Sequence, residues 1–238
     1  MTNRADPPPR GACHLWFAFL PDDVGSWLPL LAAQDLAEVA RQQHETSRRV
    51  AVVSRGLQRL IVGRYAGVDP SLVTIERSCG VCGRRDHGRP SPVAEFPLDY
   101  SVSHSGELVA LAAVGHGRVG FDLEQRHDPA ELDGLAEYVL DPAELAAYRH
   151  LPGPGRTDWL YRTWTRKEAV VKATGAGFSV DPAGVHAGLT AAAPGHRGSP
   201  PAGGPLHLRD LTCWPGYAAA AASTVPLRVI RTRRVDRQ

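Results

Sequence analysis

Two acidic residues in the segment 118–124 are spaced so that they could share one cation. Apolar side chains there alternate with Gly120, Asp122 and Glu124, so a strand would bury one face and present both carboxylates on the other. Neighbouring carboxylates repel and raise each other's pKa unless a cation neutralises them, and Mg2+ commonly binds one or two carboxylates together with phosphate oxygens. On the pattern alone, an acidic strand that faces solvent is the commoner arrangement.

A second segment places an acid between an aromatic ring and an amine. Trp164, Glu168 and Lys172 follow one another at intervals of four residues, which puts them on one face of a helix. Taken alone, Glu168 and Lys172 form an ordinary ion pair that stabilises a helix by about 0.2–0.5 kcal/mol. Together with the two acids of 118–124, they supply a third carboxylate and a cation, a combination that suits a metal ion and a pyrophosphate.

Residues 103–106 form a short polar motif. Ser103, His104 and Ser105 precede Gly106 and an apolar stretch, so hydroxyls, an imidazole and exposed backbone groups could receive phosphate oxygens. An alternative makes one serine a nucleophile and His104 its base, but adjacent residues rarely point their side chains toward each other.

Apolar patterning predicts the elements that must position these groups. The clearest is an amphipathic helix over 45–65, in which apolar residues recur at intervals of three and four with arginines between them. Asp141 before Pro142 predicts a helix start, and Gly175 ends a second long helix over 158–174. Strands are predicted at 14–20, 108–114, 118–124, 206–214 and 217–222, a helical region at 27–40, a turn-rich loop at 78–99 and a flexible loop at 191–205.

The composition is that of an ordinary globular protein. The 238 residues are 43% hydrophobic and 22% charged, and the net charge of +2 gives no general argument for nucleic-acid binding. Residues 1–11 lack the apolar stretch of a signal peptide, and no apolar run approaches the ~18 residues of a membrane span. We therefore expect no nucleic-acid or membrane partner and a cytoplasmic location.

The four cysteines do not have the pattern of a secreted disulfide scaffold. Cys79 and Cys82, followed by Asp86 and His87, resemble half of a zinc knuckle. A structural zinc ion normally needs four protein ligands, and a second pair is not evident nearby in the sequence. We expect these two cysteines to be thiols in a loop and dispensable for chemistry.

Four motifs follow one another along the chain in a characteristic order. They are Gly88-Arg89-Pro90, the Ser-His-Ser-Gly of 103–106, the Gly-Phe-Asp-Leu-Glu of 120–124, and the 164–172 segment with its Lys-Glu-Ala core. In this order and spacing they resemble the Sfp-type 4′-phosphopantetheinyl transferase family. The resemblance covers about residues 44–222 and extends to a late strand that begins after Pro215-Gly216.

The resemblance implies an α+β fold of two similar halves related by pseudo-twofold symmetry. Each half would be a helix packed on a small, mainly antiparallel sheet, with coenzyme A bound between the halves. On this chain the halves are expected at 13–115 and 116–226, with a loose N-terminal tail at 1–12 and a solvated C-terminal tail at 227–238. Two fused halves also imply a monomer.

The resemblance further implies roles for individual residues. Asp122, Glu124 and Glu168 would bind Mg2+, or Mn2+ in its place, and Glu168, Lys172 and Asp122 would be catalytic. Coenzyme A would be held by residues from both halves, namely Arg48 or Arg49, Arg89, Pro90, Ser103, His104, Lys167 and Lys172.

The activity that the resemblance implies is transfer of the 4′-phosphopantetheine arm of coenzyme A to a serine of an apo acyl or peptidyl carrier protein. Adenosine 3′,5′-bisphosphate would be released, and the carrier would be activated for fatty-acid, polyketide or nonribosomal peptide synthesis. One alternative is a metal-dependent phosphohydrolase that activates water with the same carboxylates. Another is a coenzyme A or nucleotide binding module without turnover, against which the intact Asp122, Glu124, Glu168 and Lys172 set argues.

Overall fold

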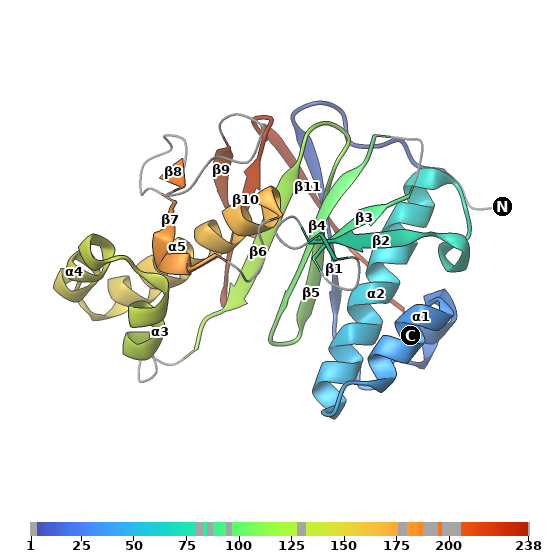
Figure 1. Cartoon of the computed structure of the whole chain (residues 1–238), viewed down its shortest axis with the longest axis horizontal. Helices are drawn as coiled ribbons and strands as arrows, with labels where there is room; N and C mark the ends of the chain where they lie inside the picture. Colours follow the sequence, from blue (N-terminus) through green and yellow to red (C-terminus); the bar gives the residue numbers. More distant parts are fainter. Residues whose placement is uncertain are drawn as a thin grey trace.

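Two 22-residue helices, α2 (Glu45–Ala66) and α5 (Gly153–Thr174), each pack against one β-sheet. The computed structural model describes residues 4–79, 83–84, 88–93, 97–127, 132–175, 180–187, 195–196 and 206–237. Figure 1 shows the two helix and sheet units beside each other, with α2 in one and α5 in the other. The α+β class expected from the sequence is confirmed.

The N-terminal sheet has four strands in the order β11-β1-β5-β4. Strands β4 (Asp99–Ser105) and β5 (Leu108–Val114) form an antiparallel hairpin, and β1 (Ala12–Phe19) pairs antiparallel with β5. Strand β11 (Val229–Arg234) joins β1 in parallel, with Ala12 opposite Val229. The C-terminal segment 227–238, expected to be a solvated tail, therefore contains an edge strand of the N-terminal sheet.

The C-terminal sheet is antiparallel and has the order β6-β10-β9. Its strands are β6 (Val119–Gln125), β9 (His207–Leu211) and β10 (Tyr217–Ser223), close to the ranges that apolar patterning predicts. Strand β10 consists largely of buried alanines, whose small side chains let α5 approach the sheet closely.

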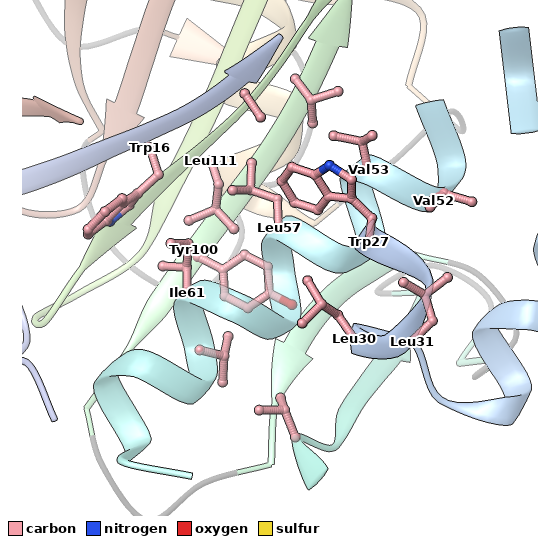
Figure 2. Close-up of a cluster of buried hydrophobic side chains, with 14 of the residues drawn as sticks. Trp16, Trp27, Leu30, Leu31, Val52, Val53, Leu57, Ile61, Tyr100 and Leu111 are labelled. Atoms are coloured by element: carbon pink, nitrogen blue, oxygen red, sulfur yellow. The ribbon is translucent and has the colours of Figure 1, made fainter. Parts of the chain in front are cut away.

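The core of the N-terminal half lies between α2 and its sheet. Figure 2 shows Leu57 and Ile61 of α2 in one cluster with Trp27, Tyr100 and Leu111, all of which are buried. Helix α2 ends where Gly67 adopts a left-handed conformation with φ 74°. The region 27–40, predicted as one helix, is divided into a 3-10 helix η1 (Gly25–Leu30) and α1 (Ala33–Ala40), because Leu31 and Ala32 are extended.

Smaller elements complete the description. Strand β3 (Arg89–Pro92) lies within 78–99, where a turn-rich loop is expected, and it pairs antiparallel with β2 (Ile75–Ser78). The predicted helix start at Asp141 is confirmed, since its carboxylate accepts hydrogen bonds from the amides of Ala143 and Glu144. The remaining elements are η2 (Pro70–Leu72), α3 (Leu132–Val139), α4 (Pro142–His150), η5 (Pro182–Gly184), β7 (Val185–His186) and β8 (Gly195–His196).

Two further expectations concern the chain ends and loops. The N-terminal segment is attached to α2 rather than loose from residue 4 onward, because the Ala5 amide donates to the Arg64 carbonyl at 2.9 Å and Pro8 is buried. Most of the predicted flexible loop 191–205 lies outside the described residues. Among the helices that are described, none has the length and apolar character needed to cross a membrane.

Candidate active site

The two halves meet where β4 and β6 run in parallel, and side chains rather than a backbone ladder join these strands. Asp99, Ser101, Ser103 and Ser105 alternate along β4 and all turn toward β6, and we call this contact the β4–β6 seam. Backbone amides of β6 donate to its side chains in turn: Val119 to Asp99 Oδ2 at 2.7 Å, Phe121 to Ser101 Oγ at 3.0 Å and Gln125 to Ser105 Oγ at 3.0 Å. The seam thereby fixes the position of the β6 carboxylates relative to β4.

Helix α5 is brought onto β6 by Gly120. A Cβ atom at this position would lie 1.9 Å from the Ala169 carbonyl oxygen and 2.3 Å from the Ala173 nitrogen, so only glycine allows this approach. Ala169 follows Glu168 and Ala173 follows Lys172, and the contact therefore places both functional side chains beside β6. The sequence predicts that Glu168 and Lys172 share a helix face, and the glycine explains how that face reaches Asp122.

Lys172, Asp122 and Ser103 form a three-membered polar network. The Lys172 ammonium donates to Asp122 Oδ1 at 2.6 Å and to Ser103 Oγ at 2.8 Å, and the Ser103 hydroxyl donates to Asp122 Oδ1 at 2.7 Å. Asp122 is 2% exposed, whereas the Lys172 side chain is 29% exposed. The lysine therefore neutralises a buried carboxylate and still reaches the surface of the site.

The other two carboxylates are held near this network and resist ionisation. Burial and the charge of Asp122 raise the pKa of Glu124 to about 7, against the opposing effects of a hydrogen bond from Ser105 and the charge of Lys172. Burial, followed by the negative charge of Asp122, also raises the pKa of Glu168, and the positive charge of Lys172 partly offsets this increase. One ammonium thus faces three carboxylates, and the site has an excess of negative charge.

These residues fit a divalent cation in their chemistry, although they do not form a closed ligand cluster. Asp122 Oδ2 is buried and has no hydrogen-bond partner within the described chain. A nearby positive charge would also stabilise the ionised forms of Glu124 and Glu168. Nowhere in the described ranges do three or more candidate ligand side chains form a group that could hold a metal ion as it stands. Oxygen ligands of this type are those that Mg2+ prefers.

His104 follows Ser103 in β4, and its side chain points to the exposed face of that strand. Its side chain is exposed, while Ser103 beside it is buried, as the alternation of a strand requires. Partial desolvation and the charge of Lys172 lower the pKa of His104, so the imidazole is neutral near pH 7. Ser103, predicted to hold coenzyme A, is instead enclosed between Asp122 and Lys172 and can act on a ligand only through them.

Arg89 forms hydrogen bonds with both halves of the protein. Its guanidinium donates to Asp99 Oδ2 at 2.5 Å, to the Val119 carbonyl at 2.7 Å and to the carbonyls of Tyr100 and Lys172. The side chain is 14% exposed and its guanidinium is already hydrogen-bonded, so it is not free for the expected contact with coenzyme A. Pro90 is partly buried in β3, opposite Arg77.

Lys167 is not brought to the site. Its ammonium is fully buried on another face of α5, where it donates to Glu144 Oε2 at 2.5 Å, the Val139 carbonyl at 2.8 Å and the Pro182 carbonyl at 3.1 Å. All three of its hydrogens are used, so the ammonium has no donor left for the expected contact with phosphate, which stays a prediction. The reason for its position away from the site is geometric, because Lys167 and Glu168 are adjacent and point about 100° apart around the helix.

Arg48 and Arg49 lie at the start of α2 and are also occupied. Arg48 bonds the carbonyls of Gln42 and Gln43, and Arg49 bonds the Pro21 carbonyl at 2.7 Å. Pro21 follows Leu20, whose amide donates to the Glu107 carbonyl, so Arg49 lies toward the same end of the sheet as the β4–β5 turn. The structure does not bring either arginine into contact with Lys172.

The cysteine motif is only partly described. Cys79 is buried at the end of β2, and Cys82, Asp86 and His87 lie outside the described residues. The sequence analysis does not identify Asp99 and Ser101 as residues of the site, although their period-two alternation with Ser103 and Ser105 in β4 is a signal of one polar strand face.

Several known proteins are similar in sequence to this chain. The family model of the 4′-phosphopantetheinyl transferase superfamily matches residues 118–221, which include β6, α5 and most of β10. The chain is 36% identical over 174 residues to the 4′-phosphopantetheinyl transferase HetI of Nostoc sp., covering 70% of each protein. It is 36% identical over 90 residues to AcpT of Escherichia coli, covering 38% of this chain and 46% of that one. It is 25% identical to a 4′-phosphopantetheinyl transferase of Bacillus subtilis over 163 residues, 64% of this chain and 68% of that protein. The chain therefore belongs to the 4′-phosphopantetheinyl transferase superfamily.

Proposed function

We propose that the protein transfers the 4′-phosphopantetheine arm of coenzyme A to a serine of an apo carrier protein and releases adenosine 3′,5′-bisphosphate. The observation that carries the proposal is the arrangement of Lys172 against Asp122, with Glu124 and Glu168 in electrostatic contact with both. A pyrophosphate brings further negative charge to such a site, so it requires both the lysine and a divalent cation.

The reaction is a phosphoryl transfer between two oxygens. The carrier serine oxygen forms a bond to the phosphorus on the pantetheine side, the bond from that phosphorus to the bridging oxygen breaks, and the bisphosphate leaves with the bridging oxygen. The serine proton passes to a base. The nucleophile belongs to the carrier, since Ser103 is buried and hydrogen-bonded within the network.

In this proposal Asp122, Glu124 and Glu168 would hold Mg2+, or Mn2+. A bound divalent cation would neutralise charge on the pyrophosphate and on the leaving oxygen. Glu168 is the residue that we assign as the base, because it is partly exposed and its raised pKa brings it closer to neutral pH.

Lys172 and His104 would bind the phosphates of coenzyme A. Two ammonium hydrogens of Lys172 are used by Ser103 and Asp122, and a third is left for a phosphate oxygen on the exposed side. His104, exposed beside them, supplies a neutral imidazole donor. Both walls of the site come from one chain, which supports a monomeric enzyme.

Mass spectrometry of an apo carrier protein tests the proposal directly. The carrier is incubated with the protein, coenzyme A and Mg2+, and a phosphopantetheine mass increment on serine is expected. Omission of coenzyme A is the control that should leave the carrier unmodified, and a Lys172→Ala variant should modify the carrier more slowly than the parent. Coenzyme A hydrolysis without any modified carrier, across acyl and peptidyl carriers, would overturn the proposal in favour of a phosphohydrolase.

A further inference from the structure

A second polar cavity lies at the edge of the N-terminal sheet farthest from the candidate active site. It has a volume of about 240 Å3 and is lined by the N-terminal segment including Asp6 and by His14, Trp16, Tyr65, Arg231 and Arg233. These residues come from β1, β11 and the end of α2, whereas the active site lies at β4 on the opposite edge of the same sheet. The proposed function leaves this cavity unexplained.

The cavity is lined mainly by hydrogen-bond donors. Arg231 and Arg233 lie on the same face of β11, opposite His14 and Trp16 of β1. Neither arginine has a hydrogen-bonded or ion-paired partner in the described part of the chain, although many of the other arginines do. The Trp16 ring holds the guanidinium of Arg233 at 5.2 Å and that of Arg64 at the same distance, so Arg233 is already positioned.

His14, which also lines the cavity, adds an unsatisfied donor. The Trp16 indole donates to the Tyr65 hydroxyl at 3.1 Å, and the Tyr65 oxygen lies 2.7 Å from His14 Nδ1. Nδ1 is the only acceptor available to the Tyr65 hydrogen among the described residues, which assigns the His14 hydrogen to Nε2. His14 is 7% exposed, and its Nε2 has no partner in those residues. A buried donor without an acceptor costs about 1–3 kcal/mol, so the site favours an oxygen ligand.

We propose that this cavity binds a small oxyanion of the phosphate class, held by Arg231 and Arg233 and satisfying the donor of His14. The volume is below the roughly 300–1,000 Å3 of pockets for drug-sized ligands, which favours a single phosphate group over a nucleotide. Paired guanidinium groups match the oxygens of such an anion. Asp6, which is exposed at the rim, is an internal competitor for the same arginines.

Titration with inorganic phosphate, followed by NMR on the His14 and Trp16 side-chain resonances at constant ionic strength, tests this site. Saturable shifts of both resonances are expected. An Arg231→Gln/Arg233→Gln double variant should bind about tenfold more weakly or not at all. Arg234→Gln is the matched control, because Arg234 is the next residue of β11 and pairs with Asp236 outside the cavity, so its affinity should equal that of the parent. Asp6→Asn should bind more tightly.

Phosphate binding at this cavity can be tested independently of the proposed transferase activity. Glu168→Gln should bind phosphate here as the parent does, whether or not the carrier is modified, because the two sites share no residue. Absence of a saturable shift in the parent, or equal affinity of the parent and the double variant, would overturn the proposal.

Discussion

The Lys172 ammonium is shared between Asp122 and Ser103, at 2.6 Å from the carboxylate oxygen and 2.8 Å from the hydroxyl. One turn earlier on α5, Glu168 faces the same carboxylate and has a raised pKa because of burial and that charge. The two residues of this helix face therefore carry opposite charges toward one buried acid, and their substitution should have different kinetic consequences.

Glu168→Gln should lower kcat for carrier modification by about 100-fold or more at saturating coenzyme A, because it removes a base and a negative ligand while keeping size. Lys172→Ala should raise the KM for coenzyme A as well as lower kcat, since the lysine contacts phosphate in ground and transition states. Steady-state kinetics on an apo carrier measures both. Circular dichroism is the control for folding, and a folded Glu168→Gln enzyme with the parental rate would contradict the assignment.

Metal-free protein should lose stability as the pH rises from about 4.5 to about 7, through the ionisation of Glu124. The pKa of this acid is raised from 4.5 to about 7 in the folded state, so its stabilising effect is complete below 4.5 and disappears above 7. Thermal unfolding across this range, with chelator present, should show the parent losing Tm relative to Glu124→Gln. Parallel curves for the two proteins would show that the carboxylate is not destabilised by its surroundings.

Lys167→Met should destabilise the fold by about 3–5 kcal/mol, since it leaves the Glu144 carboxylate and two carbonyls without their buried partner. The KM for coenzyme A of the folded fraction should stay unchanged, because this ammonium lies away from Lys172. Urea unfolding and kinetics separate the two effects. A raised KM with parental stability would restore a phosphate-binding role.

Gly120→Ala should destabilise the protein by about 3 kcal/mol or more, because the added methyl group meets the α5 backbone at 1.9 Å. Gly134→Ala is the control, as Gly134 lies within α3 and its added Cβ would meet nothing within 4 Å. That change should stabilise the protein by about 0.5–1 kcal/mol. Equal urea midpoints for the two variants would refute the close packing of α5 on β6.

Ser101→Ala should cost about 1–3 kcal/mol, because the Phe121 amide, which donates to Ser101 Oγ at 3.0 Å, is left buried without an acceptor. Ser91→Ala, at an exposed position of β3, should change stability by less than about 0.5 kcal/mol. Chemical denaturation of both variants measures this difference. If Ser101→Ala were as stable as the control, side chains would not be what joins the halves.

The sequence predicts those elements whose apolar pattern has one clear period. Apolar patterning predicts a helix over 45–65 and a strand over 108–114, and α2 lies at 45–66 and β5 at 108–114, because both bury a regular apolar surface. The convergence of Asp122 and Glu124 with Glu168 and Lys172 required the family resemblance as well, since spacing fixes only the face within each element.

Other parts could not be read from the pattern for physical reasons. Strand β11 carries exposed arginines, so its sequence looks like a solvated tail although its backbone completes a sheet edge. Helical position alone did not reveal that Lys167 faces α3 and α4, since nothing in the local sequence identifies the partner of each face. The family resemblance implies that Arg89 contacts coenzyme A, whereas the tertiary structure surrounds its guanidinium with four acceptors.

The parallel pairing of β11 with β1 also sets an order for folding. The N-terminal sheet obtains its edge strand from residues 229–234, which the ribosome adds only after the whole of β6, α5 and β10 has been made. Until then β1 has an open edge during synthesis, a state in which unpaired strands recruit other chains. The N-terminal sheet therefore cannot be completed before the C-terminal half has been synthesised, and the β1–β11 pair is one of the long-range contacts that are generally slow to form.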